Sequence, residues 1–518
     1  MRKSIALLLS VVMMIVALAG CASNSKGNQS NDQEPQGTTG EEKKADKVEK
    51  VDKVVMSFLA FVIPSEENTR AVEEAINAIT RDSIGVEVDI NIMDPASYTQ
   101  QIPLMLSGGE HLDLFSGLGM SFSSMVNNGY ALDLEQNDLI QTYGQGIIDT
   151  MGDYLNGCRV NGRLYGMPQN RDYAAPKGYA IVNEYLDKIG YTYNPNEVNK
   201  ITEAELDDIF AHLHEAYPDK TVFVTQPAAR TNIPCDYPGG DWYGVLMDPE
   251  NSLTLTNLFE TEEYFEQCNR LYKWNQLGYI SPDALTDSAG STTLIPSGAA
   301  MAYALGLKPG IILQESTSNG RAISIFSVEG QEEYILPSGS FADMPWMINS
   351  NTEVPEAAMK LMNEFYTNPV LENLLCYGIE DKDYVVDQDG FFTYPEGEDA
   401  TTVYHPNVLP FMQNEFIVGV WKGDEADVWE KTKAFNDGAI KSLAMGFSFD
   451  SSSVSSELTA LNNVYEEYRY QVEYGFLDPA TGIAEMVSRM KNAGLDTYIA
   501  EKQKQLDQWA AANNITAN

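Results

Sequence analysis

The segment from Lys53 to Ser116 alternates between strand-like and helix-like stretches, and this alternation constrains the fold more than any other feature. The stretches KVVMSFLAF (53–61) and GVEVDINIM (85–93) are apolar runs typical of buried strands. Between them, apolar residues recur at helical spacing from Val72 to Ile79, and Ser65 stands where a helix N-cap is expected. Strand, helix and strand in this order predict parallel pairing through a right-handed crossover.

A second unit of the same kind follows directly. The stretch SYTQQIPLMLSGGEHLDLFSG (97–117) predicts a helix, a glycine stop and a short strand from Leu112 to Phe115. Ligands of open parallel sheets lie beyond the carboxyl ends of the strands. We therefore expect functional residues near Phe61, near Asp94 and in the segment from Ser116 to Gly119.

The body of the chain, from about Val51 to Asn518, is too long for a single hydrophobic core, so at least two lobes are expected. Thr202 and Glu205 have capping-box spacing before a helical pattern, and TVFVT (221–225) follows as a strand. Near the C-terminus a helical stripe is predicted to face the core. It consists of Leu458, Leu461, Tyr465, Tyr468 and Val472.

The chain is strongly acidic, with 33 lysines and arginines against 75 aspartates and glutamates and a formal net charge of −42. Such a surface repels nucleic acid and anionic lipid alike, so no nucleic-acid partner is expected. Solubility explains this charge more simply than a specific cationic ligand does.

Four cysteines of the body, Cys158, Cys235, Cys268 and Cys376, are far apart and form no Cys-x-x-Cys pair. This spacing is typical neither of a zinc site nor of a disulfide framework. We expect buried small hydrophobic residues, with one or two disulfide bridges as the open alternative.

Motifs that would indicate catalysis or metal binding are weak. His212 and His214 face apart on a predicted helix, so they give no zinc motif. Asp387 to Glu396 has calcium-loop spacing, but Val385 stands at the first ligand position, so Asp389-Gly390 predicts a hairpin turn. Neither a Gly-x-Ser-x-Gly elbow nor a phosphate loop occurs in the sequence, so an esterase or ATPase is unsupported and no metal or cofactor is expected.

The N-terminus has the layout of a secretory signal, with Arg2 and Lys3 before an apolar run from Ile5 to Leu18. The residues Leu18-Ala19-Gly20-Cys21 resemble the bacterial lipobox, in which the cysteine takes a diacylglycerol. We expect a signal peptide at 1–20, lipidation of Cys21 and a disordered tether within 21–50, because the stretch from Ser23 to Lys47 has almost no apolar residues. An ordinary signal peptide with a chance cysteine is the alternative.

Several segments resemble the extracellular solute-binding proteins of ABC carbohydrate importers, family 1 of the solute-binding proteins. These segments are LMLSGGEHLDLFSG (104–117), YALDLE (130–135), VNGRLYGMPQNRDYAAPKGYAIVNEYLDKIGY (160–191), LIPSGAAMAYALGLKPG (294–310) and MPWMINSNTEVPEAAMKLMNEFYTNPVLENLLCYGIEDKDYVV (344–386). The stretch GFSFDSSSVSSELTALNNVYEEYRYQVEYGFLDP (446–479) through EKQKQLDQW (501–509) resembles the C-terminal module of one lipoprotein branch. Leu112 departs from the family pattern, which usually has proline there.

The resemblance implies an α/β fold of the two-lobed, type II periplasmic-binding-protein kind. Each lobe is expected to be an open, mostly parallel sheet flanked by helices, and hinge strands join the lobes. By this analogy, the first lobe holds 51–169 plus 305–369. The second lobe holds 170–304 plus 370–518, including the C-terminal helical module.

The resemblance also implies a receptor and not an enzyme. The expected protein is a monomer, anchored by lipid to the extracellular face of the cell membrane. It binds a carbohydrate, with an oligosaccharide favoured, between its lobes and delivers it to the transmembrane subunits of an ABC permease.

A sugar site needs flat aromatic faces for the ring and polar groups for the hydroxyls. The candidates near expected strand tips or crossings are Phe61, Ser116, Arg171, Asp172, Tyr173, Asp241, Trp242, Tyr243, Tyr303 and Trp346. The stretch GGDWYG (239–244) is the most suggestive, because it places an acid beside two aromatic residues in an expected loop. For any single aromatic residue, packing in the core is an equally open interpretation.

Three other functions stay open. A peptide receptor would have the same fold, whereas an anchored glycoside hydrolase or a surface adhesin would not be a transport receptor. A glycosidase needs only two well-placed carboxylates, which 75 acidic residues cannot exclude. Turnover of chromogenic glycosides would favour the hydrolase, and saturable binding without turnover would favour the receptor.

Overall fold

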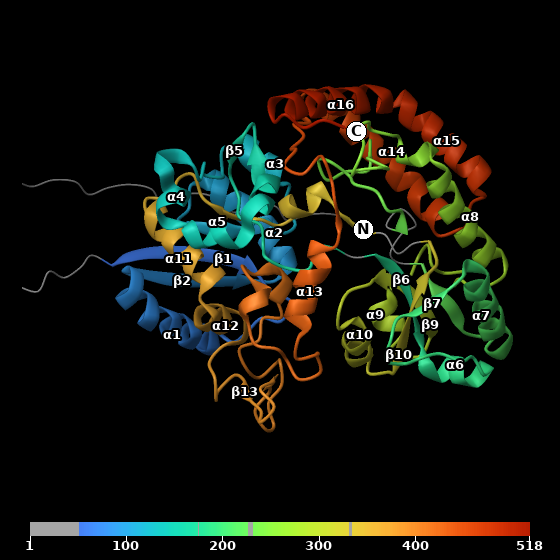
Figure 1. The fold of residues 1–518 in the computed structure, drawn as a ribbon, viewed down its shortest axis with the longest axis horizontal. Helices are drawn as coiled ribbons and strands as arrows, with labels where there is room; N and C mark the ends of the chain where they lie inside the picture. The colour runs from blue at the N-terminus through green and yellow to red at the C-terminus, as the bar shows by residue number, and fades with distance from the viewer. Residues whose placement is uncertain (1–50, 175, 226–231, 288, 331–333, 518) are drawn as a thin grey trace, which may run out of the picture. The chain divides into compact units, whose positions relative to one another are not determined.

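The computed structural model describes residues 51–517 except 175, 226–231, 288 and 331–333 (Figure 1). The predicted signal peptide, the lipobox and the tether up to residue 50 lie outside the described residues. The described residues belong to one compact unit, Lys50–Asn518. Within it, two large hydrophobic cores form around two separate sheets, which confirms the expected two-lobed α/β fold.

The first lobe contains a four-stranded sheet in the order β12, β3, β1, β2. β1 pairs in parallel with both β2 and β3, as the strand–helix alternation predicts, and β12 adds an antiparallel edge. The strands are β1 (Asp52–Leu59), β2 (Val86–Met93), β3 (Leu114–Ser116) and β12 (Trp346–Ile348). The third strand therefore begins two residues later than predicted.

Local signals set the ends of the first helix. The Ser65 hydroxyl accepts a hydrogen bond from the Asn68 backbone at 3.1 Å, and Gly85 ends the helix in the left-handed conformation. The helix packs on β2 through buried Val72 and Ile76 (Figure 1). The helices of this lobe are α1 (Glu66–Ile84), α2 (Pro95–Gly108), α3 (Phe122–Asn127), α4 (Leu139–Tyr143), α5 (Gln145–Met151), α11 (Pro355–Thr367), α12 (Pro369–Tyr377) and α13 (Val428–Asp437).

Two short hairpins accompany this lobe. They pair β4 (Arg159–Val160) with β5 (Arg163–Leu164), and β13 (Val385–Val386) with β14 (Phe392–Thr393). The second hairpin turns through Gly390, whose φ is 89°, and Asp387 Oδ1 accepts hydrogen bonds from the backbones of Asp389 and Phe391. The predicted hairpin turn at Asp389-Gly390 is thus confirmed.

The second lobe contains a five-stranded mixed sheet in the order β7, β10, β6, β9, β8. β6 is antiparallel to both of its neighbours, while β7 with β10 and β8 with β9 are parallel pairs. The strands are β6 (Lys177–Val182), β7 (Asn199–Ile201), β8 (Thr221–Val224), β9 (Ala300–Gly306) and β10 (Ile323–Val328). The helices around them are α6 (Asn183–Ile189), α7 (Glu203–Ala216), α8 (Glu262–Gln276), α9 (Ser291–Leu294) and α10 (Ile311–Asn319).

The capping box predicted for this lobe is present. The Thr202 hydroxyl accepts a hydrogen bond from the Glu205 backbone at 3.2 Å, and the Glu205 carboxylate accepts one from the Thr202 backbone at 2.7 Å. These two bonds satisfy donors that the first turn of α7 would otherwise leave unpaired.

Three helices close the chain and pack on the second lobe (Figure 1). They are α14 (Ser455–Glu473), α15 (Pro479–Asn492) and α16 (Leu495–Ala512). Both α14 and α15 contact α8. The predicted stripe on α14 is buried in the second core, except that Leu458 is only partly buried.

The two cores divide the chain differently from the expected lobe boundaries. The segment from Leu307 to Val328 was assigned to the first lobe, but it lies in the second core because β10 pairs with β6. The segment from Leu371 to Val418 was assigned to the second lobe, but most of its buried hydrophobic residues lie in the first core. The chain therefore completes the second sheet before it returns to the first lobe.

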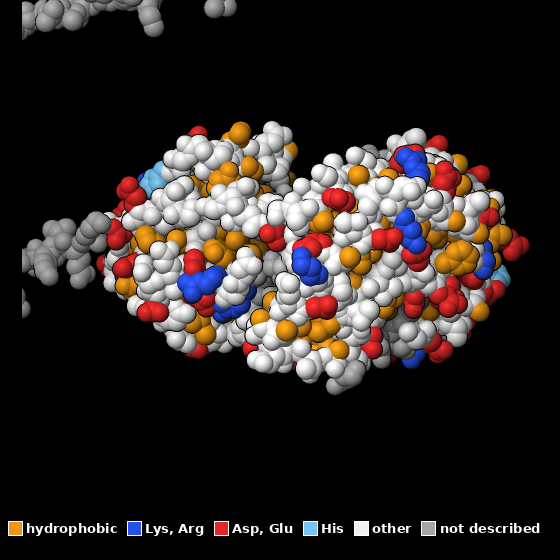
Figure 2. Space-filling view, turned by 90° about the horizontal axis from the view of Figure 1, so that it is seen from above, with side chains coloured by type: hydrophobic (Ala, Val, Ile, Leu, Met, Phe, Trp, Pro, Cys, Tyr) orange, Lys and Arg blue, Asp and Glu red, His pale blue; other side chains and the backbone are white. Residues whose placement is uncertain are grey.

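The four cysteines are free and buried, as expected for small hydrophobic residues. No helix among the described residues is long and apolar enough to cross a membrane. On the face shown in Figure 2, acidic side chains are scattered among neutral ones and do not gather into one patch.

Candidate functional site

Three segments cross between the lobes: the first lies between β5 and β6, the second between β10 and β12, and the third after α13. They meet in a small third core, formed by Tyr173, Ala174, Leu336, Phe341 and Ala439. The ring centroids of Tyr173 and Phe341 are 4.3 Å apart, so the first and second crossing segments are in direct contact. Two short strands, β11 (Ile335–Leu336) and β15 (Ile440–Lys441), pair in parallel and join the second crossing segment to the third.

Asp236 fastens a second-lobe loop to this joint. Its buried carboxylate accepts hydrogen bonds from the Ser338 backbone at 2.8 Å, from the Ser338 hydroxyl at 2.9 Å and from the Ser442 hydroxyl. Burial raises the pKa of Asp236, and the hydrogen bonds oppose that shift. One side chain thus holds the loop after β8 against two crossing segments.

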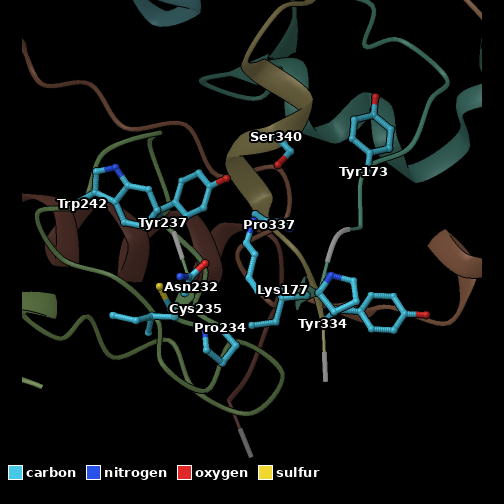
Figure 3. A pocket seen from close by; sticks show the side chains of 13 residues that line it. Tyr173, Lys177, Asn232, Pro234, Cys235, Tyr237, Trp242, Tyr334, Pro337 and Ser340 are labelled. Carbon is cyan, nitrogen blue, oxygen red and sulfur yellow. The ribbon is translucent and has the colours of Figure 1, made fainter. Parts of the chain in front are cut away.

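A first cavity, of about 260 Å³, lies beside this loop, and four aromatic residues are among those that line it (Figure 3). The rings of Tyr237 and Trp242 are 4.7 Å apart at 34° and form one side. Tyr334, from the second crossing segment, lies on the other side, with Lys177 between. These faces suit a ligand with flat apolar surfaces.

Two polar groups of the first cavity lack partners. The side chain of Lys177, at the start of β6, has no hydrogen bond or ion pair with another described residue, and burial lowers its pKa. The Asn232 side-chain oxygen is buried without a hydrogen bond. Because buried polar groups are almost always hydrogen-bonded, a donor and an acceptor are available here for a polar ligand.

A second cavity, of about 220 Å³, adjoins the first along a short 3-10 helix, Ser338–Ala342, with Ser340 lining the first and Gly339 lining the second. Its other walls come from Met120–Ser123 in the first lobe and Phe447–Phe449 near the C-terminal module. Met120–Ser123 follow β3, so this cavity lies beyond the carboxyl end of a parallel strand, just past the predicted segment from Ser116 to Gly119.

Gly239 lets the loop approach closely here. Its φ is +84°, and a Cβ at this position would lie 2.8 Å from Cβ of Phe449. Any side chain would therefore both strain the backbone and displace Phe449.

Among the described residues that line the two cavities, Asp343 is the one carboxylate. Burial raises its pKa, and the nearby Arg171 guanidinium opposes that shift. No group of three or more histidine, cysteine or acidic residues in the described part of the chain is placed to hold a metal ion.

A family described as a domain of unknown function, DUF3502, matches residues 443–511, which include nearly all of the three C-terminal helices. A carbohydrate ABC transporter substrate-binding protein of Streptococcus pneumoniae serotype 4 (strain ATCC BAA-334 / TIGR4) is 23% identical over 449 residues, covering 84% of this chain and 86% of the relative.

Solved structures extend the comparison over the whole body. The N-glycan transport solute binding protein NgtS of Streptococcus pneumoniae superposes with a TM-score of 0.77 at 21% identity, covering 89% of this chain and 100% of that one. This chain has the fold of ABC-transporter solute-binding proteins. The alginate-binding protein AlgQ2 also superposes, with a TM-score of 0.57 at 14% identity over 88% of this chain and 98% of that one. The fold that the sequence resemblance implies is confirmed.

In this solute-binding fold, two of the predicted site residues line the first cavity: Tyr173 and Trp242. Arg171 and Asp172 lie in the same crossing segment but line neither the first nor the second cavity. The Arg171 guanidinium stacks over the Tyr173 ring at 5.1 Å, and Asp172 is paired with Lys308 at 2.7 Å.

Four other predicted residues have structural roles instead. Trp346 is fully buried in the first core, and its indole N–H donates to the Phe411 carbonyl at 3.1 Å. Ser116 is buried, and its backbone N–H donates to the Tyr98 hydroxyl at 2.9 Å. Tyr243 and Tyr303 belong to the second core.

Phe61 and Asp241 also lie outside both cavities. Phe61 is 54% exposed and packs against Phe411 with ring centroids 5.6 Å apart. The Asp241 carboxylate accepts hydrogen bonds from the Lys502 ammonium at 2.8 Å and from the Tyr498 hydroxyl at 2.7 Å. Both donors belong to the C-terminal helix, so this carboxylate is already hydrogen-bonded within the protein.

The residues of the first cavity that were missed from the sequence include Lys177, Asn232, Tyr237 and Tyr334. Tyr237 carried a usable signal, because it stands directly before Pro238-Gly239-Gly240, a turn-forming run beside Trp242. Lys177 had none, since a lysine at the start of a strand is most often solvated.

Proposed function

We propose that this protein binds an oligosaccharide in the groove formed by the first and second cavities and delivers it to an ABC permease. One observation carries the proposal. The neighbouring rings of Tyr237 and Trp242 offer flat faces to a sugar ring, beside an unpartnered ammonium on Lys177 and an unpartnered amide oxygen on Asn232. Pyranose rings need this combination of apolar faces and hydrogen-bonding groups.

An oligosaccharide suits the site better than a single sugar because the two cavities adjoin along one segment. Relatives of the same fold bind such ligands: NgtS of Streptococcus pneumoniae was solved in complex with Man1GlcNAc and with Man5GlcNAc, and FusA of the same species with kestose. We take mannose- and N-acetylglucosamine-containing glycans as the first ligands to try.

A receptor role also follows from what lines the groove. Glycoside hydrolysis needs a pair of carboxylates around the scissile bond, and the described lining residues supply one, Asp343. The lining comes from both lobes, so a bound glycan contacts both. Such a ligand favours the closed arrangement by its differential affinity for it.

The membrane anchor belongs to the same proposal. Leu18-Ala19-Gly20-Cys21 would be lipidated at Cys21 and hold the receptor, as a monomer, at the extracellular face near the permease subunits. Cys21→Ser should release the protein from the membrane fraction. Unchanged membrane association of this variant would contradict the lipid anchor.

Calorimetry on the Cys21→Ser protein tests the binding proposal. We expect saturable binding to a member of an oligosaccharide panel, without turnover. Lys177→Met should weaken that binding about tenfold, equivalent to about 1.4 kcal/mol for a lost hydrogen bond. Lys188→Met, at an exposed position in the last turn of α6, is the matched control and should bind normally. Equal affinities of the two variants would place the ligand elsewhere.

A further inference from the structure

The first crossing segment is fastened to the first lobe through its backbone. The Asp172 backbone N–H donates to Glu415 Oε1 at 2.6 Å, and the Tyr173 backbone N–H donates to Asn436 Oδ1 at 3.0 Å. Asn436 lies on α13, and Glu415 lies between α12 and α13, in a segment whose buried hydrophobic residues are mostly in the first core. Asp172 therefore moves with the first lobe.

Lys308 belongs to the second lobe. It comes two residues after β9, next to Leu307, which is buried in the second core. The Leu307 backbone N–H donates to the Pro176 carbonyl at 2.6 Å, beside the start of β6. The Lys308 ammonium lies 2.7 Å from the Asp172 carboxylate. This ion pair therefore joins the two lobes.

The groups around the pair strengthen the contact between the lobes. The side chains of Lys308 and Asp172 are 29% and 18% exposed, so water and salt screen the pair only in part. Lys308 also faces Asp424, just before α13: burial raises the pKa of that carboxyl, and the ammonium opposes the shift. Arg171 lies 3.5 Å from Asp172 as well, but both belong to the same segment, so that contact does not bridge the lobes.

The pair lies on the far side of the crossing segment from the groove. Tyr173 lines the first cavity, whereas Asp172 and Lys308 line a third cavity, of about 480 Å³. This third cavity shares no described lining residue with the groove. It lies between α10 of the second lobe and α13 of the first, which are neighbours in Figure 1. Neither Asp172 nor Lys308 is therefore placed to touch a glycan in the groove.

This position determines how the pair acts on the lobes. When two lobes rotate about the segments that join them, surfaces on one side of these segments approach and those on the other side separate. Closing the groove around a glycan therefore pulls Lys308 away from Asp172. Loss of the ion pair then opposes part of the free energy that the glycan contributes to closure.

We propose that Asp172 and Lys308 are positioning residues, which hold the lobes apart at the groove and weaken glycan binding from outside it. This inference rests on the proposed function of the groove. It gives Asp172, which the sequence analysis placed among the sugar-binding residues, an action on affinity without contact with the sugar.

The first test needs no glycan. In the Cys21→Ser protein, whose four other cysteines are buried, spin labels at Leu104→Cys and Leu277→Cys report the distance between the lobes. These positions are 68% and 56% exposed, on α2 and directly after α8. Lys308→Met should shift the distance distribution, whereas Lys308→Arg, which keeps the charge, should not. An unchanged distribution for Lys308→Met would overturn the proposal.

Lys53→Met is the matched control. Its ion pair with Asp89, at 2.8 Å, joins two neighbouring strands of the first lobe, β1 and β2. Because this pair does not bridge the lobes, its loss should change neither the distance distribution nor the affinity for glycan.

The second test measures glycan affinity by calorimetry. Lys308→Met and Asp172→Asn should each bind about fivefold more tightly than the unmodified chain. The double variant should bind no more tightly than either, because all three lack the same ion pair. Unchanged or weaker binding by both single variants would overturn the proposal. If the unmodified chain bound no glycan, the proposed function would fail, and the distance measurement would still decide the role of the pair.

Discussion

Lys502, on the last helix, places its ammonium 2.8 Å from the Asp241 carboxylate, and its side chain is completely buried. The two residues are 261 positions apart in the sequence. Burial lowers the pKa of Lys502 and Asp241 opposes that shift, so the charged pair depends on both members. This pair holds the loop that carries Trp242 against α16.

Asp241→Asn should therefore destabilise the protein by about 3 kcal/mol or more, because it leaves the Lys502 ammonium buried without a counter-charge. Urea unfolding measures the loss. Replacing both residues, Asp241→Asn with Lys502→Met, should recover part of it, since no buried ammonium then remains without its partner. A double variant less stable than the single one would contradict this account.

Substitutions of Trp242 and Trp346, both predicted from the sequence to bind ligand, should have different effects on affinity and stability. Trp242→Ala should weaken glycan binding by about 2 kcal/mol, as for an aromatic anchor, with little change in melting temperature. Trp346→Phe should lower stability by about 2 kcal/mol, through a cavity and the lost hydrogen bond to Phe411, and should keep its affinity. Calorimetry and thermal unfolding of both variants give the comparison.

A lowered melting temperature with unchanged glycan affinity for Trp242→Ala would contradict a role of Trp242 in binding. That outcome would make Trp242 a packing residue against Tyr237 and the second core.

Gly239 and Gly240 form a matched pair for testing the second cavity. Both have positive φ, +84° and +81°, so alanine should cost each about 1 kcal/mol of backbone strain. A Cβ at Gly239 would also press on Phe449, whereas one at Gly240 meets nothing within 4 Å. Gly239→Ala should therefore weaken glycan binding more than Gly240→Ala does. Titration of the same glycan into both variants measures the two affinities. Equal affinities would exclude Phe449 from the binding site.

Glu372 should make stability fall as pH rises. It is completely buried, its Oε1 accepts from the Asn414 backbone at 2.9 Å, and burial raises its pKa from 4.5 to about 8. Between these two values the folded protein keeps a proton that the unfolded chain releases. The stabilisation is complete below 4.5 and is lost at up to about 1.4 kcal/mol per pH unit until about 8.

Glu372→Gln removes this titration. Relative to the unmodified chain, the variant should gain stability steadily as pH rises through that window, as measured by urea unfolding at several pH values. Glu398→Gln, at an exposed position, is the control and should show a flat difference. A flat difference for Glu372→Gln as well would mean that this carboxyl is already ionised in the folded protein.

Local signals allowed much of the fold to be predicted. The N-cap at Ser65 and the capping box of Thr202 and Glu205 are formed by residues three apart, so the sequence itself contains both partners. The parallel sheet of the first lobe followed from the order of apolar runs. The lobe boundaries did not follow, because they depend on β10 pairing with β6, about 140 residues earlier in the chain.

The site was predictable only in part. GGDWYG is a loop, as expected, but its three side chains separate: Trp242 lines the first cavity, Tyr243 lies in the second core and Asp241 pairs with Lys502. Lys177 and Tyr334 reach the same cavity from other segments. Their sequence neighbours give no indication of this.

The sequence by itself determined the α/β class, the acidic surface, the family resemblance and the ends of several helices, because these depend on composition and on residues close together in the chain. Only the tertiary structure decided which side chains face a cavity and which are buried in a core or paired with other residues. The outcome depends on residues far away in the sequence. Lys502 pairs with Asp241, and the Phe411 carbonyl accepts a hydrogen bond from Trp346, so these polar groups are satisfied within the protein. The Lys177 ammonium has no such partner among the described residues and is free for a ligand.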